Sequence, residues 1–284
     1  MRFGILGGDF RYKFLQQDLT NSGYKVYTHN NKFIEDNLQI NDIDDFFKNI
    51  NILITSIPFS KDKETIFNTK TEIKINCLIE KILNSNIKIL FGGVIDENIT
   101  EKLESKNIQV VDFFKDNSIA IFNAIPTAEG AIQTAMENSY KTLFDSQCLV
   151  LGYGRCGKIL SNMLKGMGAN VDISYRKDDD LAYIKSYGFN AINLCNLTQN
   201  INKYDFIFNT IPAQILNKDL LNNVNKQSII IDLAQAPGGV DYEYASDLNL
   251  KAIYCPNLPA RVAPLTASKI LKDKILKVCN LNIK

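Results

Sequence analysis

The residues best suited to chemistry lie in one glycine-rich stretch, Gly152-Tyr153-Gly154-Arg155-Cys156-Gly157. It follows an apolar run at 148–151 and precedes a helical pattern and a second apolar run at 171–174. In such a strand, turn, helix and strand context, the spacing is typical of a dinucleotide site. The first glycine permits the tight turn, the second lets the pyrophosphate approach the backbone, and the third lets helix and strand pack closely. The helix N-terminus offers N–H groups to the phosphates. The alternative is that these glycines serve only turns and packing.

The end of the second apolar run indicates which dinucleotide is bound. An NAD site usually has a carboxylate there for the ribose 2′-hydroxyl, whereas a 2′-phosphate needs a cation. This chain has Ser174 and Arg176 at those positions. We therefore expect NADP rather than NAD, held by Ser174 and Arg176. The alternative is that Arg176 and Lys177 are a solvated loop pair, and the three aspartates at 178–180 keep that alternative open.

The arginines are few, and they indicate candidates for substrate binding. Lysine dominates the basic residues, so a remaining arginine suggests a place where a planar, bidentate donor is needed. Arg11 follows Gly7-Gly8-Asp9, and Arg261 follows Pro256-Asn257-Leu258-Pro259. Neither belongs to the cofactor site, so both are candidates for binding a carboxylate or phosphate group of another ligand. For Arg261 the alternative is that it only anchors the last helix.

Candidates for an acid or base are also few. The chain has 1 histidine, His29, which we expect on a solvent-facing loop rather than in catalysis. This argues against a hydroxy-acid dehydrogenase that uses a histidine and a carboxylate. If a base is needed, Asp9 and Glu129 are the candidates. For Asp9, capping of the following helix is an equal alternative.

Apolar runs alternate with helical patterns along both halves of the chain, which favours parallel sheets. The expected strands are near 3–6, 25–28, 51–55, 88–91 and 108–111, then 148–151, 171–174, 191–193, 206–209, 229–232 and 252–254. We therefore predict an α/β protein with two Rossmann-like, doubly wound domains. The first covers 1–125 and is completed by 264–284, and it is expected to bind substrate or partner. The second covers 126–263 and is expected to bind NADP.

Two helices are expected to connect these domains. Pro126 precedes an apolar stripe that includes Ala128 and Met136, which predicts an interdomain helix. The alternative is a surface helix of the first domain. Pro264 opens a second pattern, with Leu271 and Ile275 on one face, and this last helix is expected to pack back on the first domain.

Ligands of such sheets bind beyond the carboxyl ends of the strands. Thr210 and Pro212 follow one expected strand, and Asp232 ends the next. We expect these residues to contact the cofactor. The alternative for Thr210 and Pro212 is that they only build the turn.

Composition limits the remaining possibilities. The net charge is +1 over 284 residues, so no electrostatic argument favours nucleic acid or an acidic membrane. No apolar run approaches the roughly twenty residues of a membrane span. The N-terminus enters a strand without a signal-peptide pattern, so we expect a cytoplasmic protein. The 6 cysteines show no metal spacing, and we expect free, buried thiols and no metal.

Several segments occur together in one order along the chain. They are Gly7-Gly8-Asp9-Phe10-Arg11, Ile125-Pro126-Thr127-Ala128-Glu129-Gly130, the glycine stretch, Asn209-Thr210-Ile211-Pro212, Asp232-Leu233-Ala234 with Pro237-Gly238-Gly239, and 258–267. Together they resemble the A-subunit family of dipicolinate synthases from spore-forming bacteria. Tyr12 departs from the family pattern, which has a polar residue there, and the stretch from Lys32 to Lys106 contributes little.

The resemblance implies an NADP-dependent oxidation. The substrate is dihydrodipicolinate, formed from 4-hydroxy-tetrahydrodipicolinate of the lysine pathway, and the product is pyridine-2,6-dicarboxylate. It also implies a flavoprotein-like B-subunit of dipicolinate synthase as partner and a place in the mother-cell cytoplasm during sporulation. Thr127, in one of the matching segments, joins Arg11 and Arg261 as a candidate for substrate binding. We also expect a homo-oligomer. The alternative is a non-catalytic dinucleotide-binding regulatory protein on the same scaffold.

Overall fold

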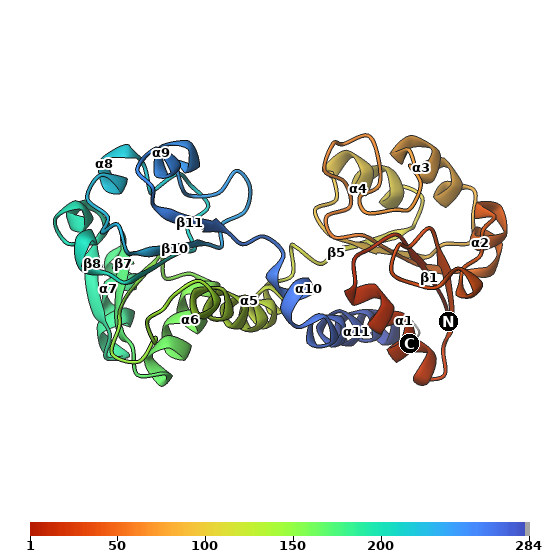
Figure 1. Ribbon diagram of the computed structural model, residues 1–284. Coiled ribbons are helices and arrows are strands. Elements are labelled where there is room, and N and C mark those ends of the chain that lie inside the picture. Colours follow the sequence, from red (N-terminus) through yellow and green to blue (C-terminus); the bar gives the residue numbers. More distant parts are fainter. Residues whose placement is uncertain (282–284) are drawn as a thin grey trace. The chain divides into compact units, whose positions relative to one another are not determined.

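The structure is a computed structural model that describes residues 1–281. The chain divides into two compact units. Unit 1 contains Met1–Ala120 and the chain from Ala263 onward, and unit 2 contains Ile121–Val262. The first division thus lies after residue 120 rather than after 125. Figure 1 shows that each unit is a sheet with helices on both faces.

Unit 1 has a parallel sheet of 5 strands in the order β2-β1-β3-β4-β5. This is the flavodoxin-like order of doubly wound proteins, with its switch point between β1 and β3. The strands are β1 (Arg2–Leu6), β2 (Lys25–His29), β3 (Ile52–Thr55), β4 (Ile89–Gly92) and β5 (Gln109–Asp112). The helices are α1 (Arg11–Asn21), η1 (Asp36–Leu38), α2 (Ile43–Asn49), α3 (Ile75–Leu83), α4 (Glu97–Glu104) and α11 (Pro264–Leu281).

Two apolar clusters cover the two faces of this sheet. One combines side chains of α2, α3 and α4 with Leu53 and Leu90 of the strands. The other combines α1 and α11 with Phe3, and in it Leu271 and Ile275 of α11 are completely buried. The predicted packing of the last helix on the first domain is therefore confirmed.

Unit 2 has a parallel sheet of 6 strands in the order β11-β10-β9-β6-β7-β8. The strand order therefore proceeds from β6 to β7 and β8 on one side and from β9 to β10 and β11 on the other, as in the Rossmann fold. The switch point lies between β6 and β9. The strands are β6 (Gln147–Leu151), β7 (Asn170–Tyr175), β8 (Asn190–Asn193), β9 (Phe206–Asn209), β10 (Ile229–Asp232) and β11 (Lys251–Tyr254). The helices are α6 (Arg155–Gly166), α7 (Asp178–Ser186), η2 (Leu194–Gln199), η3 (Ile201–Lys203), α8 (Lys218–Leu221), α9 (Tyr242–Asp247) and α10 (Leu258–Val262). The predicted fold class is confirmed, and the predicted strands coincide with the observed ones to within a residue or two at their ends.

The helix between the two sheets differs from its prediction. It is α5 (Asn117–Glu137), and Pro126 lies inside it rather than at its start. Asp116 explains the earlier start, because its carboxylate accepts hydrogen bonds from the N–H groups of Ser118 and Ile119. The apolar stripe of this helix also differs from the predicted one, which included Met136. Ala128, Ala131 and Ala135 are fully buried, whereas Met136 is 54% exposed.

Two further expectations are tested by burial and length. Among the described residues, no helix is both long and apolar enough to cross a membrane. All 6 cysteines are free, but Cys77 and Cys195 are exposed, so the expectation of buried thiols is wrong for these two.

Candidate functional site

The candidate site of unit 2 lies at the carboxyl edge of its sheet, where β6 is flanked by β7 and β9. The turn from β6 to α6 contains the three motif glycines. Gly152 has φ +93°, a conformation that a side chain would strain. A Cβ at Gly157 would lie 2.1 Å from the carbonyl oxygen of Gly152, so helix and turn pack too closely for any other residue. A Cβ at Gly154 would meet nothing within 4 Å. The turn is therefore closely packed at Gly152 and Gly157. It is open at Gly154, where a pyrophosphate is expected.

The N-terminus of α6 carries no cap from the protein. Among the described residues, no side chain bonds its first N–H groups, and its first turn contains no acidic residue. Five other helices, α2, α4, α5, α8 and α9, begin with an Asp or Asn side chain that caps them. The N–H groups of Arg155, Cys156 and Gly157 are thus free to bind an anion. The exposed Arg155 adds a cation at the same place.

Two side chains of the motif have other environments. Tyr153 is 6% exposed and packs in the apolar cluster between the sheet and α6, so only its backbone faces the turn. The predicted cofactor contact of Tyr153 is thus one of its backbone, and it stays a prediction. Burial raises the pKa of the Cys156 thiol to about 12. Cys156 is thus a neutral side chain at pH 7 that offers the site its N–H.

At the end of β7, the two residues predicted to select the cofactor, Ser174 and Arg176, have different environments. Ser174 is 1% exposed, and its Oγ accepts the N–H of Gly152 at 3.0 Å. It holds the glycine turn, which corrects its predicted contact with the 2′-phosphate. Arg176 is exposed and, within the described part of the chain, forms no ion pair. The aspartates at 178–180 form the first turn of α7, where they stabilise the helix dipole.

Thr210 and Pro212 follow β9 on the other side of the switch point. The Thr210 hydroxyl donates to the carbonyl of Leu151 at 2.8 Å, and its Oγ1 would lie 2.9 Å from a Cβ at Gly152. Thr210 thus packs against the glycine turn, and Pro212 is exposed beside it. Both lie at the edge where the cofactor is expected.

Asp232, at the end of β10, is completely buried. Its Oδ1 accepts from Asn209 Nδ2 at 2.8 Å and from the N–H of Ala234 at 3.1 Å. Its Oδ2 accepts from the N–H of Gly239 at 2.7 Å and from the Tyr242 hydroxyl at 2.8 Å. The predicted direct contact with a cofactor is therefore corrected: Asp232 holds together the loops that follow β9 and β10.

The first turn of unit 1 also follows a first strand, but the chain itself fills it. Asp9 and Arg11 form a two-pronged ion pair, with Arg11 Nη2 2.7 Å from Asp9 Oδ2 and Arg11 Nε 2.9 Å from Oδ1. Asp9 Oδ1 also accepts the N–H of Arg11 at the start of α1. Burial acts to lower the pKa of Arg11, but bonding to Asp9 outweighs it and the pKa is raised. Asp9 thus has a capping and pairing role that opposes its prediction as a base, and Arg11, 4% exposed, is paired within the chain.

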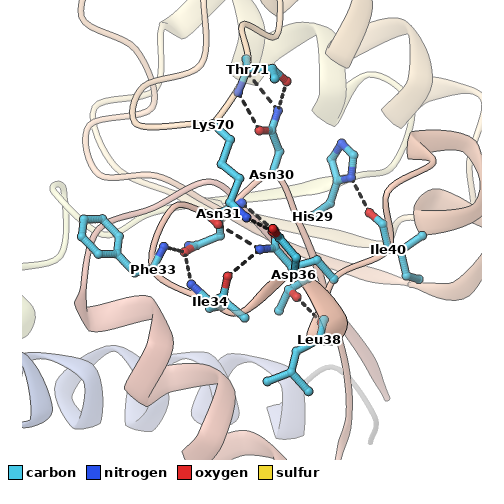
Figure 2. A network of polar contacts seen from close by, with 12 residues as sticks. His29, Asn30, Asn31, Phe33, Ile34, Asp36, Leu38, Ile40, Lys70 and Thr71 are labelled. Atoms are coloured by element: carbon cyan, nitrogen blue, oxygen red, sulfur yellow. Dashed lines mark hydrogen bonds and ion pairs between the residues drawn. The ribbon is translucent and has the colours of Figure 1, made fainter.

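Polar side chains from two loops close over this turn. Asn31 Nδ2 donates to the carbonyl of Gly7, and Asn68 Nδ2 donates to that of Gly8 at 2.9 Å. Figure 2 shows how Asn31 and Asn30 are held: Asn31 Oδ1 accepts the N–H groups of Phe33 and Ile34, and Asn30 bonds to Thr71. The carboxyl edge of unit 1 at β1 is thus covered by its own loops.

Two residues beside this turn differ from expectation. His29 is 8% exposed, with Nδ1 2.7 Å from the carbonyl oxygen of Ile40, so the expected solvent-facing loop is wrong (Figure 2). Tyr12 is completely buried below Gly8, and its hydroxyl donates to the carbonyl of Thr55 at 2.7 Å. An aromatic ring fits there because the hydroxyl still finds a partner.

The remaining candidates lie on α5 and α10. Glu129 is exposed on a surface groove that Met163 also lines. Met163 lies eight residues after the first residue of α6, roughly 12 Å along the helix axis at 1.5 Å per residue. The Thr127 hydroxyl donates to the carbonyl of Asn123 within the helix, which corrects its role as a free donor. Arg261 is exposed and has no ion-pair partner within residues 1–281. Of the substrate candidates, Arg261 alone keeps a free cation.

Sequence reasoning did not identify the partners of Asp232. Asn209 occurs in the sequence analysis only as the first residue of a matching segment, and Tyr242 does not occur there; their hydrogen bonds to Asp232 join residues 23 and 10 positions apart. The signal that was available is that Asn209 and Asp232 each end an adjacent strand. Among the described residues, no group of acidic, histidine or cysteine side chains is placed to hold a metal.

Two family models match the chain. Residues 2–114 match the model that describes the N-terminal domain of the dipicolinate synthase A-subunit. Residues 119–241 match "D-isomer specific 2-hydroxyacid dehydrogenase, NAD binding domain". The first match includes the stretch from 32 to 106 that had contributed little to the resemblance.

Relatives and solved structures of the same kind are similar to the chain. The dipicolinate synthase A-subunit of Bacillus subtilis (strain 168) is 36% identical over 193 residues, which are 67% of this chain and 64% of the relative. The aligned part thus spans less than two thirds of that relative's own length. The A-subunit structure from Bacillus halodurans has a TM-score of 0.85 at 26% identity and covers 98% of this chain and 97% of its own. The corresponding structure from Bacillus subtilis has a TM-score of 0.84 at 27% identity, covering 99% and 96%.

Proposed function

We propose that this chain, which belongs to the dipicolinate synthase A-subunit family, is the NADP-binding catalytic component of a dipicolinate synthase. The reaction is the oxidation of dihydrodipicolinate to pyridine-2,6-dicarboxylate. The observation that carries the proposal is the open glycine turn of unit 2. A Cβ at Gly154 would meet nothing within 4 Å, directly at the uncapped N-terminus of α6. That space and those N–H groups fit the pyrophosphate of a dinucleotide.

Different residues of unit 2 bind different parts of the cofactor. The N–H groups of Arg155, Cys156 and Gly157 hold the pyrophosphate. Arg176 supplies the cation for the 2′-phosphate, and Ser174 keeps the turn in shape through its bond to Gly152. Because Arg176 stands where an NAD site has a carboxylate, NADP is preferred over NAD. Arg261 is the candidate for a carboxylate of the substrate, since a guanidinium binds it with two parallel hydrogen bonds.

The chemistry demands mainly positioning. A bound NADP supplies the acceptor for a hydride from a ring carbon, and a proton leaves the substrate separately. Formation of the aromatic ring drives both losses, so the protein has to align the ring and exclude competing orientations. Asp9, held by Arg11, is not free to accept that proton, so no side chain is assigned as the base.

The assembly and its setting complete the proposal. The chain acts in the cytoplasm of the mother cell during sporulation, together with a flavoprotein-like B-subunit, and forms a homo-oligomer. These points are supported by membership of the family alone. The competing function is a non-catalytic dinucleotide-binding regulator on the same scaffold, because a fold does not fix a function.

Reconstitution tests the proposal. The purified chain is mixed with its flavoprotein-like partner, the lysine-pathway intermediate and NADP, and dipicolinate is followed by chromatography alongside NADPH absorbance. We expect both products, and neither with Gly154→Asp. A folded chain that binds NADP but gives neither product with a competent partner would favour the regulatory function.

A further inference from the structure

The carboxyl edge of unit 2 has two halves that serve different ends of a dinucleotide. In a Rossmann sheet each half binds one mononucleotide across the switch point. Arg176 follows β7, so the β7 side is that of the adenosine half under the proposed function. The nicotinamide half then lies over the loops that follow β9 and β10, and Asp232 is buried between these two loops.

The side chain of Asp232 is surrounded by hydrogen-bond donors. The N–H groups of Ala234 and Gly239 and the amide nitrogen Nδ2 of Asn209 can only donate, and each oxygen of Asp232 accepts two hydrogen bonds. The close approach of Gly239 is also required, because a Cβ there would lie 2.0 Å from Asn209 Nδ2. Burial, and then bonding to Asp232, raise the pKa of Tyr242, which keeps that hydroxyl a donor.

No cation forms an ion pair with this carboxylate within residues 1–281. By contrast, the other buried carboxylate of this sheet, Asp172, is paired with Lys203 at 2.7 Å. A buried charge that only neutral groups stabilise keeps a field that water and salt screen weakly. The carboxylate of Asp232 therefore gives a negative electrostatic potential at the loops that follow β9 and β10.

We propose that Asp232 makes the site discriminate between the two oxidation states of the cofactor, favouring the oxidised form. The inference rests on the proposed function. The oxidised nicotinamide ring carries a positive charge and the reduced ring carries none, so only the oxidised ring gains from the carboxylate. The reduced cofactor is then held less tightly and is released more readily after the hydride is transferred. Asp232 acts through space and as a positioning residue for the two loops, without touching the ring.

Binding constants test this without any turnover. Calorimetry measures Kd for NADP, for NADPH and for adenosine 2′,5′-bisphosphate, which lacks the nicotinamide. With one buried charge acting at low screening, wild type is expected to bind NADP about tenfold more tightly than NADPH. Asp232→Asn should lower this preference at least about fivefold and leave the bisphosphate unchanged.

Two matched variants separate charge from structure. Tyr242→Phe removes one hydrogen bond but keeps the carboxylate, so the preference for NADP should persist. Asp172→Asn removes a buried carboxylate under the adenosine half, and the preference should again persist. If all three variants shift the ratio alike, the charge of Asp232 is not its cause and the inference fails.

The remaining outcomes are also decisive. If Asp232→Asn does not fold, the wild-type ratio alone decides, because equal or tighter binding of NADPH contradicts the inference. If wild type binds the bisphosphate and both cofactors but the ratio is unchanged in Asp232→Asn, the inference fails and the proposed cofactor site stands. If wild type binds none of the three ligands, both the cofactor site and the inference fail.

Discussion

Each unit has a glycine turn between its first strand and its first helix, and the two turns are opposites. In unit 1, Arg11 and Asp9 form a buried ion pair in the turn, and Asn31 and Asn68 bond to its carbonyls. In unit 2, a Cβ at Gly154 meets nothing, and no side chain caps the helix that follows. The turn after the first strand is thus occupied by the protein's own side chains in unit 1, the closed turn, and is free for a ligand in unit 2, the open turn.

The difference shows that a glycine-rich turn is by itself no evidence of a ligand. At Gly8 a Cβ would lie 2.4 Å from the ring of Tyr12, so that glycine is required by the protein's own packing. At Gly154 no atom of residues 1–281 would lie within 4 Å of a Cβ, so packing among these residues does not require a glycine there. A glycine that packing does not explain is the better indicator of a site.

The largest expected effect concerns the closed turn. Asp9→Asn leaves the guanidinium of Arg11, 4% exposed, without its carboxylate. Breaking such a buried pair costs about 3 to 5 kcal/mol in the free energy of unfolding. Urea unfolding measures this cost, and calorimetry should show an unchanged Kd for NADP. Asp45→Asn, which removes an exposed pair with Lys48, is the control and should change stability little. Wild-type stability in Asp9→Asn would contradict the closed turn.

The next effect concerns the open turn. Gly154→Asp places a carboxylate where the pyrophosphate is expected and should weaken NADP at least about 100-fold, since like charges meet at a helix N-terminus. Because space is free there, the unfolding midpoint should stay close to wild type. Gly8→Ala should do the reverse, with lower stability and no effect on NADP, because Gly8 has φ +102° above Tyr12. Equal effects of the two variants on binding would remove the contrast between the turns.

A smaller effect tests which dinucleotide the open turn accepts. Arg176→Ala removes a charge-assisted bond of roughly 1.5 to 3 kcal/mol and should weaken NADP at least about tenfold. NAD, which lacks the 2′-phosphate, should bind as before. Lys185→Ala, at the far end of α7, is the control. The same loss for both cofactors would rule out Arg176 as the 2′-phosphate ligand.

The smallest effect concerns the way unit 1 is closed by the last helix. Hydrogen bonds from Lys274 of α11 and from Ser118 hold the pKa of Asp116 well below its usual range. A lowered pKa in the folded state means that this stabilisation is present above the unfolded pKa of about 4 and is lost as pH falls. Asp116→Asn should cost about 1 kcal/mol at pH 7, and less as the pH is lowered below about 4. Urea unfolding at a series of pH values measures the cost, and a cost that does not change with pH would exclude the ionised pair as its cause.

Much of the fold was contained in local sequence patterns. Apolar runs separated by helical spacing predicted every observed strand and the parallel, doubly wound class, because a strand buried on both faces must be apolar throughout. The glycine spacing predicted the turn of unit 2, since its first and third glycines obey constraints of the backbone alone. The helix that contains Pro126 starts earlier than its apolar stripe indicates, because Asp116 caps it at residue 117.

Side-chain roles at the strand ends were decided by the tertiary structure. Ser174, Asp232 and Arg11 are polar residues at carboxyl edges, and from sequence each suited a ligand. Each instead finds its partner within the chain, and for Ser174 and Asp232 those partners, Gly152 and Asn209, lie 22 and 23 residues away. Sequence spacing tells which residues reach an edge of the sheet, because strands have a fixed period. Whether a polar group there is already satisfied depends on contacts between strands and loops distant in sequence, and only the folded chain brings these together.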